Sequence, residues 1–267
     1  MTPMTAIPTI IRSKPVLSLQ DEVAALRAEL STEKQARIAA ESKLAFLHTE
    51  QPESESLEPP PSRMAIIVGL AKLAESRDDD TGKHLSRIRH YTTLIATEFS
   101  KLHPELLSKT DVPVIGATSV LHDIGKVGIS DDILLSPNKL TDQQFDTMKR
   151  HTSIGADILI SLSEQLGRDP WVDTAIQITL GHHEKWDGTG YPFGLRGETN
   201  NLPARIVAVA DVYDALTSKR VYKDAMSHND AVELIKRDSS SHFDPKVVDA
   251  FLSVKDEVQQ IANRLKE

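Results

Sequence analysis

Apolar residues near the start of the chain recur at alternating spacings of four and three. They are Leu19, Val23, Leu26, Leu30, Ala40, Leu44 and Leu47. This spacing is typical of a coiled-coil-like helix. Glu33 and Arg37 take the middle seam positions, so the seam is strong only at its ends. We predict a disordered stretch over residues 1–15, followed by a dimerising or signal-relaying helix over residues 16–50. The alternative is one amphipathic helix packed on its own domain.

An acidic, proline-rich stretch follows this helix. Residues 51–62 read QPESESLEPPPS, a composition that favours an extended and solvated chain. We therefore predict a linker here, with a second unit over residues 63–267. The polar linker also favours a dimerising or relaying role for the preceding helix over packing on its own domain.

The second unit has a helical pattern almost throughout. Ser62 can cap a helix over MAIIVGLAKLAES, Thr141 with Gln144 makes a capping box, and Asp244-Pro245 opens the last helix. Glycine and proline crowd at residues 125–131 and 187–203, where irregular links are expected. No segment alternates like a strand, and no internal repeat has a fixed period. The pattern predicts an all-α helical bundle.

Composition narrows the chemistry. The chain has 267 residues, 39% of them hydrophobic, and no cysteine, which excludes disulfides, thiolate zinc sites and a cysteine nucleophile. Any metal ion must be held by His, Asp and Glu. The net charge of −8 argues against a binder of nucleic-acid polymers, although a local basic cluster could still hold a phosphate ester. With neither a secretory leader nor a membrane-spanning run, the chain is expected to be cytoplasmic.

The sequence neighbours of several histidines indicate a metal site. His182 and His183 are adjacent, and neighbouring imidazoles more often grip a metal ion than pack in a core, because each buried ring needs a hydrogen bond. Asp211 interrupts an apolar helix, where a carboxylate is costly unless paired or metal-bound. Each such residue alone is a weak signal, because a single His-Asp dipeptide is expected by chance in this composition.

Six blocks, in order, resemble the HD-GYP subgroup of the HD-domain metallophosphohydrolases. They are ESRDDDTGKHLSRIRHY, LHDIGKVGISDDILLSPNKLT, FDTMKRHTSIGADIL, GHHEKWDGTGYPFGLRGE, PARIVAVADVYDALTSKRVYKDA and HFDPKVV, within residues 64–251. The resemblance implies an all-helical HD bundle behind the coiled-coil-like helix. It also implies hydrolysis of cyclic di-GMP to linear pGpG, by attack of a metal-bridging hydroxide on phosphorus, and leaves a second cut to GMP open.

The same resemblance implies which side chains hold metal. One divalent ion is held by His84, His122, Asp123 and Asp211, and Asp123 bridges to a second ion held by His151, His182 and His183. Histidine and carboxylate ligands suit iron or manganese first, with zinc and nickel as further candidates. Asp78 matches an acid near the bridging water, although Glu75 and Arg77 can instead brace their helix as a charge pair.

Other positions match substrate contacts of the family. Lys126, one turn after Asp123, is expected to neutralise a phosphate oxygen or assist the leaving group, and Arg220 with Lys223 is expected to contact nucleotide phosphates. Tyr191 lies in a Gly-Pro-framed loop and is expected to stack on guanine or to recruit a signalling partner such as a GGDEF-type protein. The plainer alternatives are a surface lysine, a solvated basic cluster and simple turn chemistry.

Some positions depart from the family pattern. Asp80 stands where many relatives have a glutamate that can bind a third ion. Because aspartate is one methylene shorter, we expect two ions rather than three. Polar residues also replace the usual Pro, Lys and Gly after the HD pair, and two serines stand where glycine is common before HFDP. They are Ser130, Ser136, Asn138, Ser240 and Ser241.

Two alternatives to a cyclic di-GMP phosphodiesterase remain open. One is an HD hydrolase that acts on another cyclic dinucleotide. The other is a signalling scaffold, in which the metal centre stabilises the fold while the coiled-coil helix and the Tyr191 loop bind partners. Loss of turnover in a folded His122→Ala protein would separate an enzyme from a scaffold, and substrate competition would separate the two enzymes.

Overall fold

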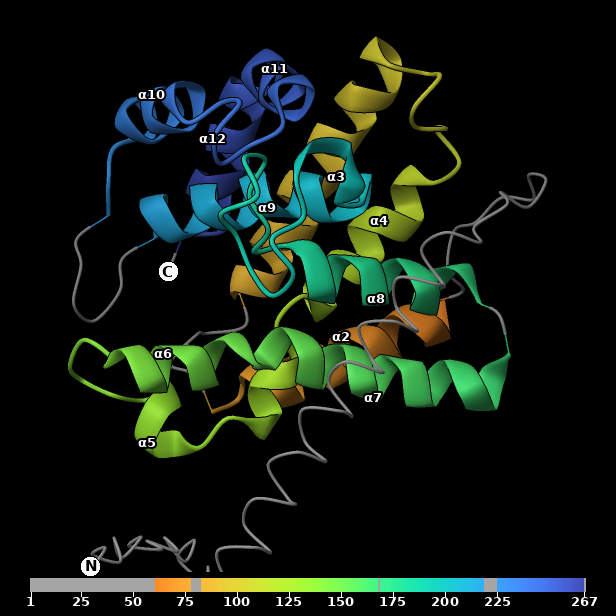
Figure 1. The fold of residues 1–267 in the computed structure, drawn as a ribbon. Helices are drawn as coiled ribbons and strands as arrows, with labels where there is room; N and C mark the ends of the chain where they lie inside the picture. Colours follow the sequence, from red (N-terminus) through yellow and green to blue (C-terminus); the bar gives the residue numbers. More distant parts are fainter. Residues whose placement is uncertain (1–60, 78–82, 168, 219–224, 267) are drawn as a thin grey trace, which may run out of the picture.

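The structure, a computed structural model, describes residues 61–77, 83–167, 169–218 and 225–266. Helices account for most of this part of the chain (Figure 1). The helix predicted at residues 16–50 and most of the linker lie outside the described residues. No strand occurs among the described residues, which hold only two isolated bridges, Asp187 to Arg196 and Ser239 to Phe243. The predicted all-α class is therefore confirmed.

The helices of the described residues follow one another in this order along the chain. They are α2 (Pro61–Glu75), α3 (Lys83–Leu102), α4 (Val112–Thr118), η1 (Ser119–Leu121), η2 (Ile124–Gly128), α5 (Asp131–Leu134), α6 (Asp142–Lys149), α7 (His151–Leu166), α8 (Pro170–Gly181), η3 (Gly197–Thr199), α9 (Leu202–Thr217), α10 (His228–Arg237), α11 (Pro245–Ser253) and α12 (Lys255–Arg264). Among the described residues, no helix has both the length and the apolar character needed to cross a membrane.

Two large apolar clusters hold the bundle together. The first joins α3, α9, α10 and α11 around fully buried rings such as Tyr91, Tyr213 and Phe251. The second joins α2, α7 and α8 around Leu121 and Leu159. Figure 1 shows the elements of the first cluster in the upper part of the molecule and α2 and α7 in the lower part.

The helix ends agree with the sequence in part. Thr141 and Gln144 form the predicted capping box of α6, and the side chain of Asp244 caps α11. Ser62 is not the cap of the first described helix, because α2 already begins at Pro61, and proline suits the first helical position. The helix that Asp244 opens is not the last one, because the chain leaves helical geometry at Val254 and begins α12.

Candidate metal centre

Seven of the predicted site residues come together from five parts of the fold. His84 lies in the first turn of α3, His151 is the first residue of α7, and His182 is the C-cap of α8. Asp211 lies within α9. The remaining ones are His122 and Asp123, between η1 and η2, and His183, directly after His182.

The turn that carries His122 and Asp123 is shaped by a close backbone approach. After α4 the chain tightens into two 3₁₀ turns, one on each side of this pair. A Cβ atom on Gly125 would lie 1.8 Å from the carbonyl oxygen of His151 and 2.4 Å from the backbone nitrogen of Gly155. Only glycine allows this approach, which brings Asp123 next to the first turn of α7.

The seven side chains form two groups, each able to hold one ion. Asp123, His151, His182 and His183 make one group, and His84, His122 and Asp211 make the other. Within each group the ligand atoms lie within 4.8 Å of one another.

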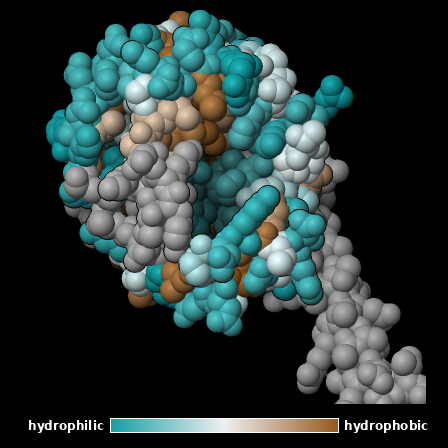
Figure 2. All heavy atoms as spheres, turned by 90° about the vertical axis from the view of Figure 1, so that its left-hand side faces the viewer, coloured by the Kyte–Doolittle hydropathy of each residue, from teal (hydrophilic) through white to brown (hydrophobic). Residues whose placement is uncertain are grey.

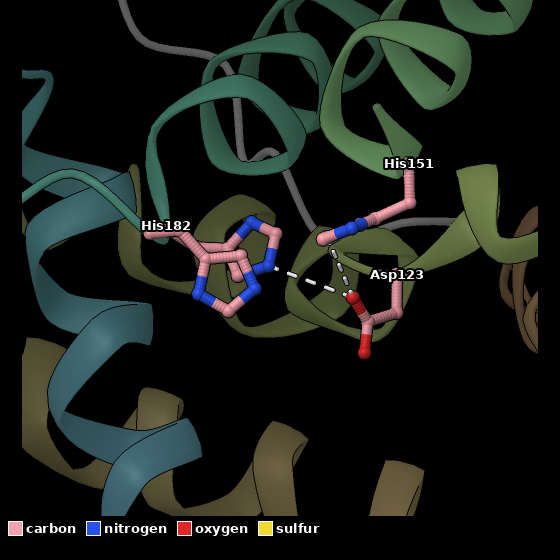
Figure 3. Close-up of side chains that lie close together, drawn as sticks. Asp123, His151 and His182 are labelled. Carbon is pink, nitrogen blue, oxygen red and sulfur yellow. Dashed lines mark ion pairs between the residues drawn. The ribbon is translucent and has the colours of Figure 1, made fainter. Parts of the chain in front are cut away.

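Asp123 faces both groups. Its Oδ1 lies 3.2 Å from Nε2 of His151 and 3.5 Å from Nε2 of His182 (Figure 3), while its Oδ2 lies 3.4 Å from Nε2 of His122. The two oxygens therefore point to different groups, as a carboxylate that bridges two ions would require.

Each of four imidazoles is oriented through its Nδ1 atom. Nδ1 of His122 lies 2.9 Å from the carbonyl oxygen of Ser119, and Nδ1 of His151 lies 2.8 Å from that of Met148. His182 meets carbonyl oxygens of its own helix in the same way, and His84 meets Asp214. An Nδ1–H that donates in this way leaves Nε2 as the lone-pair atom, directed at the site.

Buried nitrogen atoms without hydrogen-bond partners show that these residues fit a cation. Nε2 of His122, of His151 and of His182 is buried, and none has a hydrogen-bond partner among the described residues. Buried polar atoms are nearly always satisfied, since leaving one unpaired is costly. A set of imidazoles and carboxylates with such atoms facing inward suits a divalent transition metal.

The pKa shifts of three groups in the metal-free chain, His122, His183 and Asp123, favour the form that binds metal. Burial lowers the pKa of His122 to about 4 despite the nearby Asp123 carboxylate. Burial and the neighbouring His182 and His151 hold the pKa of His183 well below its ordinary value. Burial would raise the pKa of Asp123, but Lys126, whose Nζ lies 2.9 Å from Oδ2, and the neighbouring histidines hold it well below its usual range.

Asp214 is a site residue that sequence reasoning missed. Its Oδ2 lies 2.8 Å from Nδ1 of His84, and its Oδ1 accepts a hydrogen bond of 2.6 Å from Nε of Arg87. Burial would lower the pKa of His84, but this hydrogen bond and the charge of Asp214 raise it to about 9. The signal that could have revealed it is a second acid three positions after Asp211 in the apolar helix α9.

Glu75 also lies nearer the site than expected. Predicted as half of a pair with Arg77, it is 4% exposed, and its Oε1 lies 3.8 Å from Nε2 of His84. Arg77 instead donates from Nε to Oδ1 of Asp131 across 3.1 Å. No local pattern indicated this placement of Glu75, because His84 lies nine residues further along the sequence, in another helix.

The loop after α8 is held by a buried carboxylate. Glu184 is 2% exposed and accepts hydrogen bonds from the backbone N–H groups of Phe193, at 2.6 Å, and Leu195, at 3.0 Å. A Cβ on Gly190 would lie 2.3 Å from the backbone nitrogen of Lys185. The loop therefore folds back tightly on its own beginning.

Tyr191 lies beside the candidate metal centre. Its ring stacks on that of His183, with centroids 4.7 Å apart, and the residue is half-buried rather than exposed. One face of the ring is thus occupied by a proposed ligand. The other predicted site residues, Asp78, Asp80, Arg220 and Lys223, lie outside the described residues.

Some side chains of the centre are partly exposed to solvent. The side chains of Asp123, Asp211 and Lys126 are 12%, 19% and 21% exposed. Figure 2, which looks at the molecule from the left of Figure 1, shows a hollow in the surface with hydrophilic residues at its floor and a hydrophobic area above it.

Comparison with known proteins places the chain among HD proteins. A family model described as "HD domain" matches residues 19–247. The chain is 46% identical over 209 residues to a protein of Vibrio cholerae named cyclic di-GMP phosphodiesterase, an alignment that covers 77% of this chain and 42% of that protein.

Two further relatives differ in their names. The cyclic di-GMP phosphodiesterase response regulator RpfG of Xanthomonas campestris is 36% identical over 254 residues, which cover 95% of this chain and 62% of RpfG. A 3'3'-cGAMP-specific phosphodiesterase 2 of Vibrio cholerae is 37% identical over 192 residues, which cover 72% of this chain and 35% of that protein. The chain thus spans between about one third and two thirds of the length of these relatives.

Proposed function

The chain belongs to the HD domain family, and from that premise we propose that it is a metal-dependent phosphodiesterase. Its substrate is cyclic di-GMP, which it hydrolyses to linear pGpG, with a second cut to GMP as a further step. The observation that carries this proposal is the pair of ligand groups that share Asp123. Relatives named cyclic di-GMP phosphodiesterases, at 36% to 46% identity, support the choice of substrate.

The chemistry follows from the charge of the substrate. A phosphodiester is anionic and repels an ordinary nucleophile, and two divalent ions supply both an acidified water and positive charge for the phosphoryl oxygens. In the reaction, oxygen of water bonds to phosphorus, the bond from phosphorus to O3′ breaks, and O3′ gains a proton.

The residues of the chain have separate tasks in this reaction. His84, His122, His151, His182, His183, Asp123 and Asp211 hold the two ions. Lys126 keeps an ammonium group 2.9 Å from Oδ2 of Asp123, where it offsets phosphate charge or assists the departing oxygen. Asp78 as an acid near the reacting water, and Arg220 and Lys223 as phosphate contacts, remain predictions outside the described residues.

The finer points of the proposal rest on sequence. Iron or manganese is proposed for the two ions, with zinc and nickel as further candidates, and a third ion at Asp80 is not expected. A homodimer through residues 16–50, contacts of the Tyr191 loop with GGDEF-type partners, and a cytoplasmic location also remain predictions.

A second candidate substrate is another cyclic dinucleotide. It is favoured by the 37% identity to a relative named as specific for 3'3'-cGAMP. An assay that contains 3'3'-cGAMP and cyclic di-GMP at equal concentration distinguishes the two candidate activities, because the preferred substrate is consumed first. Preferential loss of 3'3'-cGAMP would replace cyclic di-GMP in the proposal.

The main test is turnover of cyclic di-GMP by anaerobically purified protein, with manganese or ferrous iron added. Asp123→Asn keeps the size of the side chain but removes the shared charge, so it should lower turnover about 100-fold or more. Asp249→Asn, at an exposed position on α11, is the matched control and should keep full activity. A folded wild-type protein that binds metal but does not hydrolyse either dinucleotide would favour the scaffold.

A further inference from the structure

A row of aromatic rings leads from the candidate metal centre to the surface of α6. His183 and Tyr191 stack with their centroids 4.7 Å apart and their planes at 27°. Tyr191 then meets Phe145 nearly edge-on, with centroids 6.2 Å apart and planes at 80°. Phe145 precedes His183 by 38 residues in the sequence, so the tertiary fold brings these rings together.

Phe145 stands at the open end of this row. It is 45% exposed, and α6 has no buried residue, so the ring is not there to fill the core. Single exposed apolar residues are common on protein surfaces. What distinguishes Phe145 is its place beside Tyr191. This ring lies next to the site where, under the proposed function, a cyclic dinucleotide with flat, partly apolar bases binds.

Lys149 holds the outer part of the row in position. Its Nζ lies 4.8 Å from the centroid of the Phe145 ring and 5.9 Å from that of Tyr191. The same Nζ pairs with Oδ1 of Asp146 across 2.8 Å. A cation over a ring is attracted by its face, so Lys149 steadies Phe145 while much of the ring remains open to solvent.

We infer that Phe145 contacts a nucleobase of the substrate by stacking. The inference rests on the proposed hydrolysis of a cyclic dinucleotide, whose bases are attached close to the reacting phosphates. The metal ligands and Lys126 address the phosphate, whereas a base needs a flat apolar surface. Aromatic side chains stack on any base, because every base has a π-face. Phe145 therefore contributes to binding of the substrate and not to the chemical step.

The test compares Phe145→Ala and Phe145→Trp with the wild-type protein in steady-state hydrolysis of cyclic di-GMP. Loss of one stacking contact should raise KM about fivefold or more, with kcat and the number of bound metal ions unchanged. Tryptophan restores a stacking surface, so Phe145→Trp should return KM towards the wild-type value. Leu135→Ala, at a 49% exposed apolar residue that caps α5, is the control and should leave KM unchanged.

The outcomes distinguish a substrate contact by Phe145 from a structural role of this residue. An unchanged KM in Phe145→Ala, beside an active wild-type protein, would overturn the inference and leave the proposed function standing. Loss of bound metal, or of kcat without rescue by tryptophan, would assign Phe145 a structural role and also overturn it. A wild-type protein that does not hydrolyse cyclic di-GMP would remove the proposed function and this inference together.

Discussion

Asp214 connects the candidate metal centre to the surrounding helices, although it is not one of the proposed metal ligands. It accepts hydrogen bonds from His84 and from both Nε and Nη2 of Arg87. All three side chains are at most 5% exposed. Burying a charge pair costs desolvation free energy, and removing one partner leaves the other as an uncompensated buried charge. Asp214 therefore orients a proposed ligand and neutralises a buried arginine at once.

Replacing this carboxylate tests both tasks. Asp214→Asn should lower metal affinity about 10- to 100-fold, as is usual when a group that orients a ligand is lost. It should also lower the free energy of unfolding by about 3–5 kcal/mol, because Arg87 keeps its charge in a buried place. Metal titration and urea denaturation measure the two effects. Asp249→Asn is the exposed control, and an Asp214→Asn protein equal to it in both measurements would contradict the assignment.

Gly125 makes a second prediction at the scale of one residue. Gly125→Ala places a Cβ 1.8 Å from the carbonyl oxygen of His151, so the turn and α7 must move apart. Such overpacking costs about 1–3 kcal/mol of unfolding free energy, and metal binding should weaken because Asp123 and His151 separate. Gly69→Ala is the matched control: nothing lies within 4 Å of its Cβ in α2, and alanine should stabilise that helix by about 0.5–1 kcal/mol.

At the scale of single residues, the proposed metal ligands could be predicted from the sequence. The side chains that orient these ligands could not. Chemically distinctive residues such as His122 and the His182-His183 pair stand in blocks that resemble a known family, and the structure brings them together. Asp214 orients His84 from a position 130 residues further along the chain. Such a contact depends on how α3 packs against α9, and no local spacing encodes that packing.

Among the elements, the loop from α8 to α9 is held in part by Glu184. A buried carboxylate that accepts two backbone N–H groups holds the loop around Tyr191. Hydrogen bonds to a charged group contribute about 1.5–3 kcal/mol. Glu184 therefore holds the part of the loop that directly follows Tyr191.

Glu184→Gln should loosen this loop without unfolding the bundle. The amides of Phe193 and Leu195 should exchange with solvent about tenfold faster or more, because 1.4 kcal/mol corresponds to a factor of ten. Hydrogen-exchange mass spectrometry measures this directly. Glu198→Gln changes an exposed glutamate of the same loop, which pairs only at the surface with Lys246, and should leave exchange unchanged. Equal exchange in both variants would show that Glu184 does not hold the loop.

The elements themselves were predictable where a helix end has its own chemistry. Thr141 with Gln144 and Asp244 with Pro245 are local signals, and both open helices in the structure. The break at Val254 before α12 has no such signal, since valine is not a helix stop. The tight turns around His122 and Asp123 depend on the contact of Gly125 with α7, which is a tertiary effect.

On the scale of the whole molecule, the candidate metal centre joins the two apolar clusters. Asp211 lies on α9, a helix of the first cluster, whereas His151 opens α7 and His182 caps α8, which are helices of the second. His84 lies on α3, which contributes residues to both clusters. Bound ions would therefore stabilise the packing of the two parts against each other. The all-helical class was readable from periodicity, whereas this division of the ligands between clusters was not.

Removal of metal should lower the stability of the whole bundle. An ion present at 100 times its Kd contributes about 2.7 kcal/mol, which corresponds to a fall in Tm of about 5–10 °C for a domain of this size. Differential scanning fluorimetry with and without a chelator measures the change, and added metal should reverse it. A Tm that does not respond to chelator or to metal concentration would contradict a centre that links the two clusters.

The most direct test of the central claim is the number of metal ions bound per chain. The account predicts about two ions in wild-type protein purified without air, because two ligand groups share Asp123, and fewer than two in Asp123→Asn. Elemental analysis against protein concentration gives this number without any assumption about substrate. A well-folded wild-type chain that binds no metal would contradict the account.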